Sequence, residues 1–95
     1  MSAALPRYMA RMAASFPLSA GPTTVGREPG RDIQLPMDTT VSRRHARIEN
    51  EGGAFVVYDE GSSNGTSVNG RPISRQEIVS GDAIHFGTSA FRFEQ

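Results

Sequence analysis

Cysteine and lysine are absent from this sequence, and no long apolar run occurs in it. Without cysteine, the chain has neither a disulfide framework nor a thiolate metal site. No apolar stretch approaches the roughly 18 residues of a membrane-spanning helix, and the N-terminus lacks the continuous apolar segment of a signal peptide. We therefore expect a cytoplasmic protein with no membrane partner.

The formal net charge is zero, which removes the electrostatic footprint of a typical nucleic-acid-binding protein. All ten basic residues are arginine, and half of them gather between Arg27 and Arg47. A guanidinium group is a planar fork that can bind phosphate or carboxylate through two hydrogen bonds, which an ammonium group cannot do. Genome base composition can also produce an all-arginine inventory, so the clustering is more informative than the choice of residue.

The composition indicates the fold class. Only 37% of residues are hydrophobic, whereas the chain has 10 glycines and 6 prolines. This balance favours many short strands joined by tight turns. The 95 residues provide for one domain with a modest core. We predict an all-β sandwich of roughly eight to eleven short, mainly antiparallel strands.

The strand pattern is clearest in the second half of the chain. The segment 54–59 (AFVVYD) is apolar on both faces and is predicted to be a central strand. Asn69-Gly70 is a preferred pair for a two-residue type I′ turn, so segments 66–68 and 71–73 should form a hairpin. The segment 74–80 is predicted to be irregular.

The N-terminal segment has no clear strand pattern. We divide the single domain into an N-terminal segment over residues 1–22, with poorly defined first strands, and the sandwich proper over residues 23–95. Phe16 and Leu18 alternate across Pro17 as on an edge strand, where proline is tolerated. Four other residues fit the period of a strand as well as that of a short helical turn: Tyr8, Met9, Met12 and Ala13.

Three polar clusters separate the apolar runs, each at a predicted strand end and therefore in a loop: Gly26-Arg27, Ser42-Arg43-Arg44-His45 and Ser62-Ser63-Asn64-Gly65-Thr66. A phosphorylated side chain carries nearly two negative charges and three acceptor oxygens. Arg27 and Arg43 would provide cations for it, Ser42 and Ser63 hydroxyl groups, and Asn64 an amide for the attached peptide. Alone, each residue would more often be an ordinary loop residue. Together they predict a non-catalytic phosphopeptide site.

These clusters, followed by Val68-Asn69-Gly70, resemble the forkhead-associated (FHA) domain family. The family pattern of Gly-Arg, Ser-x-x-His, Ser/Thr-Asn-Gly-Thr and Asn-Gly occurs in that order, within a resemblance that covers about residues 23–93. The resemblance implies a β-sandwich of about eleven strands whose loops at one end bind phosphothreonine peptides. It also implies a partner phosphorylated by a Ser/Thr kinase, and we expect no metal and no cofactor. The chain could be part of a larger regulatory protein.

The resemblance also assigns roles to individual residues. Arg27 and Ser42 would contact the phosphate, and Arg43 and Ser63 would assist them. Asn64 would hold the peptide backbone. Five residues would support the structure without contacting the ligand: Gly26, His45, Gly65, Asn69 and Gly70.

Two positions leave the details of the resemblance open. Thr40 occupies the position that helps to select the residue three beyond the phosphothreonine, and its small side chain leaves that preference open. Arg31 stands where asparagine is common, so bonding within its loop could differ. The first strand matches poorly, so the pairing of the first 24 residues stays open, as does strand exchange with a second copy.

Other functions fit the sequence less well. The motif Gly-x-Ser-x-Gly at 61–65 is followed by a predicted strand and hairpin, whereas a hydrolase would need a helix there. His45 and His85 show no metal-ligand spacing. The run of Arg43, Arg44 and Arg47 suggests nucleic-acid binding, but strand alternation would divide it between two faces. The main alternative is an FHA fold that binds its partner, or itself, independently of phosphorylation.

Overall fold

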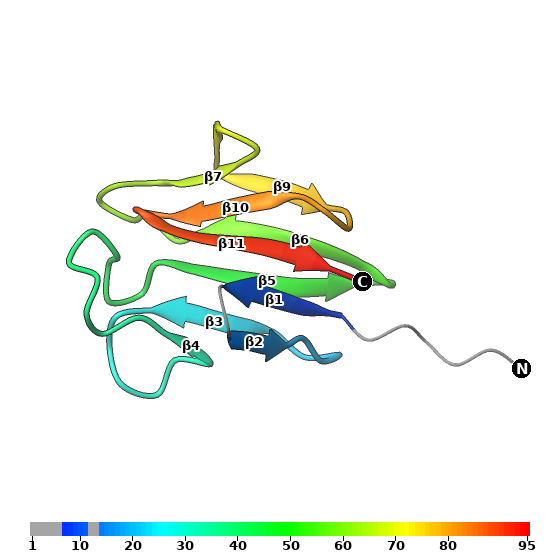
Figure 1. Ribbon diagram of the computed structural model, residues 1–95, viewed down its shortest axis with the longest axis horizontal. Helices are drawn as coiled ribbons and strands as arrows, with labels where there is room; N and C mark the ends of the chain where they lie inside the picture. Colours follow the sequence, from blue (N-terminus) through cyan, green and yellow to red (C-terminus); the bar gives the residue numbers. More distant parts are fainter. Residues whose placement is uncertain (1–6, 12–13) are drawn as a thin grey trace, which may run out of the picture.

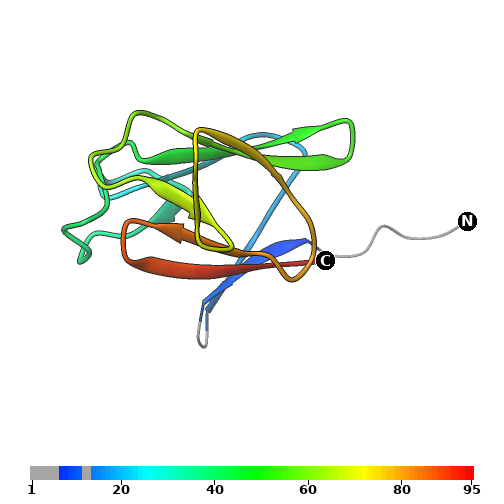
Figure 2. The ribbon, with the colours of Figure 1, turned by 90° about the horizontal axis from the view of Figure 1, so that it is seen from above.

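The computed structural model describes residues 7–11 and 14–95 of the chain. Met12 and Ala13, two of the residues with an ambiguous period, lie outside the described residues. The described part contains eleven strands in two sheets packed face to face (Figures 1 and 2). It contains no helix, and therefore none long and apolar enough to cross a membrane. The prediction of an all-β sandwich is confirmed.

Six strands form one sheet in the order β2-β1-β11-β10-β7-β8, and five form the other in the order β4-β3-β5-β6-β9. Their bounds are β1 (Tyr8–Arg11), β2 (Ala14–Pro17), β3 (Thr23–Gly26), β4 (Ile33–Gln34), β5 (Ala46–Glu51), β6 (Ala54–Asp59), β7 (Thr66–Val68), β8 (Arg71–Ile73), β9 (Arg75–Ile78), β10 (Ala83–Phe86) and β11 (Ser89–Glu94). Neighbouring strands are antiparallel, except that β3 and β4 are parallel.

In the described part of the N-terminal segment, Tyr8 and Met9 lie on β1, which pairs with β2 as an antiparallel strand. β1 pairs with β11 and places Met9 opposite Phe93. β2 lies at the edge of the six-stranded sheet, as predicted from Phe16 and Pro17. Met9 is fully buried, so this hairpin contributes to the core.

The segment 74–80 was predicted to be irregular, and this is wrong. Residues Arg75–Ile78 form β9, which pairs with β6 at the edge of the five-stranded sheet. Only Ile78 is buried among its four residues, so an alternating hydrophobic pattern never develops. β6 is flanked by β5 and β9, and its interior position confirms the prediction for the AFVVYD segment.

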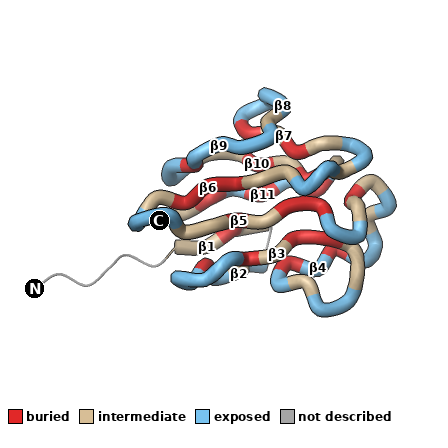
Figure 3. The backbone as a smooth tube through the Cα atoms, turned by 180° about the vertical axis from the view of Figure 1, so that it is seen from behind, coloured by how far each residue is buried: buried red, intermediate tan, exposed pale blue. Residues whose placement is uncertain are grey.

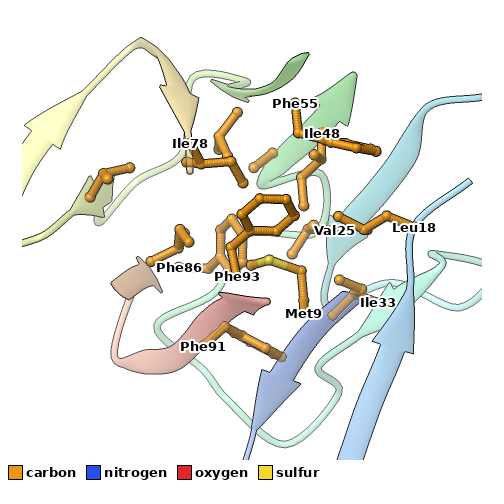
Figure 4. Close-up of a cluster of buried hydrophobic side chains, with 14 of the residues drawn as sticks. Met9, Leu18, Val25, Ile33, Ile48, Phe55, Ile78, Phe86, Phe91 and Phe93 are labelled. Atoms are coloured by element: carbon orange, nitrogen blue, oxygen red, sulfur yellow. The ribbon is translucent and has the colours of Figure 1, made fainter. Parts of the chain in front are cut away.

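Buried residues occur along the strands of both sheets (Figure 3). The core lies between the sheets and is rich in phenylalanine (Figure 4). Phe55 from one sheet packs on Phe93 from the other, with ring centroids 5.6 Å apart. Phe86 and Phe91 pack edge to face at the same centroid distance. Burying one such side chain contributes about 1.5–3 kcal/mol. This rigid core holds the ends of the strands in fixed positions.

Strand register places several loops at one end of the sandwich. Val25 pairs with Ala46, and Ala46 pairs with Asp59, so β3 and β6 end where β5 begins. In the other sheet Thr66 pairs with Phe86, which aligns the start of β7 with the end of β10. The loops leaving these strands therefore meet at one end, on the left of Figures 1 and 2. All three polar clusters lie there.

The Asn69-Gly70 turn lies at the opposite end of β7. It joins β7 to β8, and both residues have positive φ, 51° for Asn69 and 83° for Gly70, as a type I′ turn requires. The Asn69 side chain accepts a hydrogen bond from the Ala83 amide at 2.9 Å and donates to Asp82 at 2.9 Å. The predicted hairpin is confirmed, and its turn is remote from the loops that carry the three polar clusters.

Candidate functional site

Arg27 follows β3 and lies across the neighbouring loop. Its amide donates to the Ser42 carbonyl at 3.0 Å, and its Nε donates to the Val41 carbonyl at 2.9 Å. Within the described residues, these bonds leave both terminal guanidinium nitrogens without a partner. The backbone thus fixes the arginine by its Nε and keeps a two-pronged cation for a ligand.

Gly26 has a steric reason to be glycine. A Cβ atom at this position would lie 1.9 Å from the Arg43 carbonyl oxygen. No side chain fits at that distance, so any other residue would force Arg27 and the Arg43 segment apart.

Ser42 connects two of the loops. Its hydroxyl oxygen accepts a hydrogen bond from the Ser63 amide at 3.0 Å. Because that bond uses a lone pair of the oxygen, the hydroxyl proton stays available for an acceptor such as a phosphate oxygen. Ser42 is partly exposed, so a ligand can reach this hydroxyl.

His45 is fully buried beneath these loops. Its Nδ1 accepts a hydrogen bond from the Ser42 amide at 3.0 Å, so the proton of the neutral ring is on Nε2, which donates to the Gly65 carbonyl at 2.9 Å. The ring packs edge to face on Phe86 with centroids 5.9 Å apart. Both ring nitrogens are engaged, so His45 has none free to activate Ser63 as a nucleophile.

The third loop is shaped by Asp59 and Ser62, two residues that the sequence analysis did not assign to the site. The Ser62 hydroxyl donates to Asp59 at 2.6 Å and accepts from the Gly65 amide at 3.0 Å. The Thr66 hydroxyl also donates to Asp59 at 2.6 Å. Burial alone would raise the pKa of Asp59, but hydrogen bonds from Ser62 and Thr66 hold that pKa below its ordinary value.

Ser63 and Asn64 are exposed at the tip of this loop. The Asn64 side chain donates through Nδ2 to the Thr40 carbonyl at 2.9 Å. Within the described residues this is its one hydrogen bond, so Oδ1 and the second amide proton are available to a peptide backbone. Asn64 therefore combines a fixed orientation with a free donor and a free acceptor.

Arg43 and Arg27 line a surface hollow of about 320 Å³ together with Glu28 and Pro29. Both arginines can therefore face one anion. Arg43 and Arg44 lie in the loop before β5, which begins only at Ala46, as expected for a polar cluster at a strand end. The strand alternation that was expected to divide Arg43, Arg44 and Arg47 between two faces therefore does not apply to Arg43 and Arg44. Both are exposed loop residues, and Arg44 is paired with Glu28 at 3.3 Å.

Thr40 lies beside the site but its hydroxyl is engaged within the protein. It donates to Asp38 at 2.5 Å and accepts from the Thr88 amide at 2.9 Å. Asp38, Thr88 and Ser89 are therefore further parts of the loop cluster that the sequence analysis did not identify. An aspartate two residues before a threonine is typical of a local turn, and only this spacing could have indicated from the sequence that Asp38 bonds to Thr40.

The structure thus brings most of the predicted residues together. Eight of them gather at the loop end of the sandwich: Gly26, Arg27, Thr40, Ser42, Arg43, His45, Ser63 and Asn64, with Gly65 beside them. Asn69 and Gly70 lie at the other end, and their contribution is to the hairpin.

The chain is similar to known proteins in both sequence and structure. The family described as the FHA domain matches residues 23–87. The glycogen accumulation regulator GarA of Mycolicibacterium smegmatis is 47% identical over 72 residues, covering 76% of this chain and 45% of GarA. The chain spans about half the length of the curated relatives it matches.

Two solved structures superimpose closely on the fold. One, from a study of phosphothreonine-dependent FHA domain interactions, has a TM-score of 0.88 at 30% identity and covers 96% of this chain and 97% of its own. The other is EmbR of Mycobacterium tuberculosis in complex with a low-affinity phosphopeptide. Its TM-score is 0.87 at 35% identity, over 94% of this chain and 24% of EmbR.

Proposed function

The chain belongs to the FHA domain family, and on this premise we propose that it is a non-catalytic module that binds a phosphothreonine-containing protein or peptide. The observation that carries the proposal is the Arg27–Ser42 pair. The backbone bonds of Arg27 leave a free guanidinium fork beside a hydroxyl whose own proton is unused. A dianionic phosphate matches this combination of charge and donors.

The phosphate would contact the loops from three sides. Arg27 would form charge-assisted hydrogen bonds with it, and the Ser42 hydroxyl would donate a further bond. Arg43 lines the same hollow as Arg27 and would add a second positive charge. Ser63 is joined to Ser42 through its amide, so its exposed hydroxyl can reach the same ligand.

The peptide would be held mainly through its backbone. Asn64 can donate to a carbonyl and accept from an amide at once, which suits a main-chain peptide group. Among the described residues, the hollow lined by Arg27 and Arg43 is open to the surface, so we expect micromolar affinity, about −8 kcal/mol. Such affinity suits a signalling module that follows the output of a Ser/Thr kinase.

The partner protein is also a proposal. The similar EmbR structure is a complex with a phosphopeptide, and the similar protein GarA is named as a regulator. We infer that this domain acts within a regulatory protein and recruits a phosphorylated partner. An FHA fold alone would fit binding with or without phosphorylation. The free guanidinium group of Arg27 beside the Ser42 hydroxyl favours binding that depends on phosphorylation.

A peptide library tests this function. Matched peptides carrying threonine, phosphothreonine or phosphoserine would be measured against the purified domain by fluorescence anisotropy. We expect binding of a subset of phosphothreonine peptides and none of their unphosphorylated forms. Equal binding of both forms would instead indicate a phosphorylation-independent module. Binding of any DNA or RNA with steep salt dependence would indicate a nucleic-acid site.

A further inference from the structure

The turn between β10 and β11 contacts both of the loops that carry the proposed peptide-binding groups. The Gly87 amide donates to the Gly65 carbonyl at 3.0 Å. The Thr88 amide donates to the Thr40 hydroxyl at 2.9 Å, and the fully buried Ser89 donates its hydroxyl to Asp38. Every residue of the turn thus bonds to a recognition loop.

The turn and the Thr40 loop approach very closely. A Cβ atom at Gly87 would lie 2.5 Å from the Thr40 hydroxyl oxygen and 2.7 Å from its carbonyl oxygen. Gly87 also has positive φ, 57°. The position of the Thr40 carbonyl therefore depends on this turn. That carbonyl is the acceptor for Asn64.

Asp38 is the central acceptor of this network. Its Oδ1 accepts from the Thr40 amide at 2.9 Å and from the Thr40 hydroxyl at 2.5 Å. Its Oδ2 accepts from Ser89 and from the Thr88 hydroxyl at 3.2 Å. An ionised carboxylate only accepts hydrogen bonds, so it can satisfy all of these donors at once.

The directions of the hydrogen bonds from Ser89 and Thr40 to Asp38 are determined. Arg11 on β1 donates to the Ser89 oxygen at 3.3 Å, so the single Ser89 proton is left for Asp38. The Thr88 amide donates to the Thr40 oxygen, so the single Thr40 proton also goes to Asp38. Hydrogen bonds from Ser89 and Thr40 hold the pKa of Asp38 well below its usual range.

We propose that Asp38, supported by Ser89, is a positioning residue for ligand recognition: it fixes the Thr40 carbonyl, which in turn orients the Asn64 amide toward the bound peptide. This rests on the proposed function of the same site. Asp38 does not contact the ligand in this scheme. Ser89 and Arg11 lie outside residues 23–87, the part of the chain matched by the family.

The scheme separates two kinds of ligand. A phosphothreonine peptide uses both the phosphate group contacts and Asn64. A minimal ligand without any peptide group, isopropyl phosphate, presents only the phosphate to Arg27 and Ser42. Losing the Asp38 network should therefore weaken the peptide and leave the minimal ligand nearly unchanged.

The test measures both ligands against variants by NMR titration, with calorimetry for the peptide. Asp38→Ala should weaken the peptide roughly tenfold, through the lost orientation of one hydrogen-bonding group. Its affinity for the minimal ligand should stay within about twofold. The Asn64 side-chain amide signals should shift in the free protein. Asp38→Asn and Ser89→Ala, which keep more of the network, should weaken the peptide less.

A matched control and a double-variant cycle decide the outcome. Asp32 accepts bonds from the Thr24 amide and hydroxyl at 2.9 and 3.0 Å, away from Asn64, so Asp32→Ala should not weaken the peptide. In an Asn64→Ala background, Asp38→Ala should have no further effect on peptide affinity. Additive losses, or equal losses for both ligands, would overturn the positioning role.

Two further results keep the proposal separate from the proposed function. If Asp38→Ala fails to fold, Asp38→Asn and Ser89→Ala carry the same double-variant test. If Arg27→Ala binds both phosphorylated ligands as the native chain does, the proposed function itself is wrong. If Arg27→Ala abolishes binding while Asp38→Ala changes nothing, only the positioning role is wrong.

Discussion

The hydroxyl oxygen of Ser42 accepts a hydrogen bond from the amide of Ser63 at 3.0 Å, although the two residues are 21 positions apart in the chain. This bond joins the loop between β4 and β5 to the loop between β6 and β7 at one end of the sandwich. Beneath it, His45 joins the same loops a second time, through Ser42 and Gly65. A surface of short loops is thereby held as a rigid platform, which lowers the entropic cost of binding a ligand.

The neighbouring serines Ser62 and Ser63 should respond differently to truncation. Ser62→Ala removes a bond to Asp59 and the acceptor for Gly65, so it should lower stability by about 1–2 kcal/mol. Ser63→Ala should leave the melting temperature unchanged and weaken the phosphothreonine peptide several-fold. Thermal melts and calorimetry on both variants check this. The assignment fails if the two variants exchange these effects.

Replacing His45 should affect the fold and the site together. His45→Leu leaves the Ser42 amide without a partner inside the protein, and such a loss costs about 1–3 kcal/mol. It also removes one of the two donors to the Gly65 carbonyl, which keeps its bond from the Gly87 amide. We expect a clear fall in the free energy of unfolding in urea. His85→Ala, at a partly exposed position on β10, is the control and should change stability by less than about 1 kcal/mol. Similar losses of stability in both variants would contradict the role of His45 in joining the two loops.

Glycine at position 26 should be required by the approach of Arg43. Gly26→Ala places a methyl group where the Arg43 carbonyl oxygen already lies, and the forced shift should cost about 1–3 kcal/mol or more. It should also weaken the phosphopeptide, because Arg27 follows directly. Gly21→Ala is the matched control, since a Cβ there meets nothing within 4 Å. Urea denaturation compares the two, and a neutral Gly26→Ala would contradict the predicted contact.

Acid should destabilise the domain through Asp59. Its folded pKa is depressed, whereas in the unfolded chain an aspartate titrates near about 3.9. Between these two values the unfolded state binds more protons, so stability rises with pH there. The stabilisation by the ionised Asp59 carboxylate is present above the unfolded pKa, about 4, and is lost as pH falls through the folded pKa. As pH is lowered from 7 to 2, the melting temperature should fall less steeply for Asp59→Asn than for the native chain. Parallel profiles would contradict this.

Local features of the chain could be predicted from the sequence, and long-range ones could not. Asn69-Gly70 specified its hairpin because the turn depends on the φ preferences of those two residues. β9 was missed because an edge strand with one buried residue carries no alternation. Only the family resemblance distinguished Ser63 from Ser62, because which hydroxyl turns toward Asp59 depends on the folded loop. Ser89 and Asp38 are 51 positions apart, and only the packing of the two sheets brings them together.

The FHA resemblance predicted that loops at one end of the sandwich carry the candidate site, and the structure brings most of the motif residues together there, because the motifs lie at strand ends. It did not indicate the bonds between them. Arg27 binding the Val41 carbonyl through Nε, for example, follows from the register of β3 and β5. The physical basis of the site therefore appears only in the assembled sandwich.

Calorimetry on Arg27→Ala with one phosphothreonine peptide tests the central claim most directly. Arg71→Ala is the charge-matched control, because Arg71 is exposed on β8 beside the remote Asn69-Gly70 turn. The account predicts that Arg27→Ala loses about 2–5 kcal/mol of binding free energy, enough to abolish detectable binding, with its fold intact. Arg71→Ala should bind as the native chain does. Native-like binding by Arg27→Ala would contradict the proposed site.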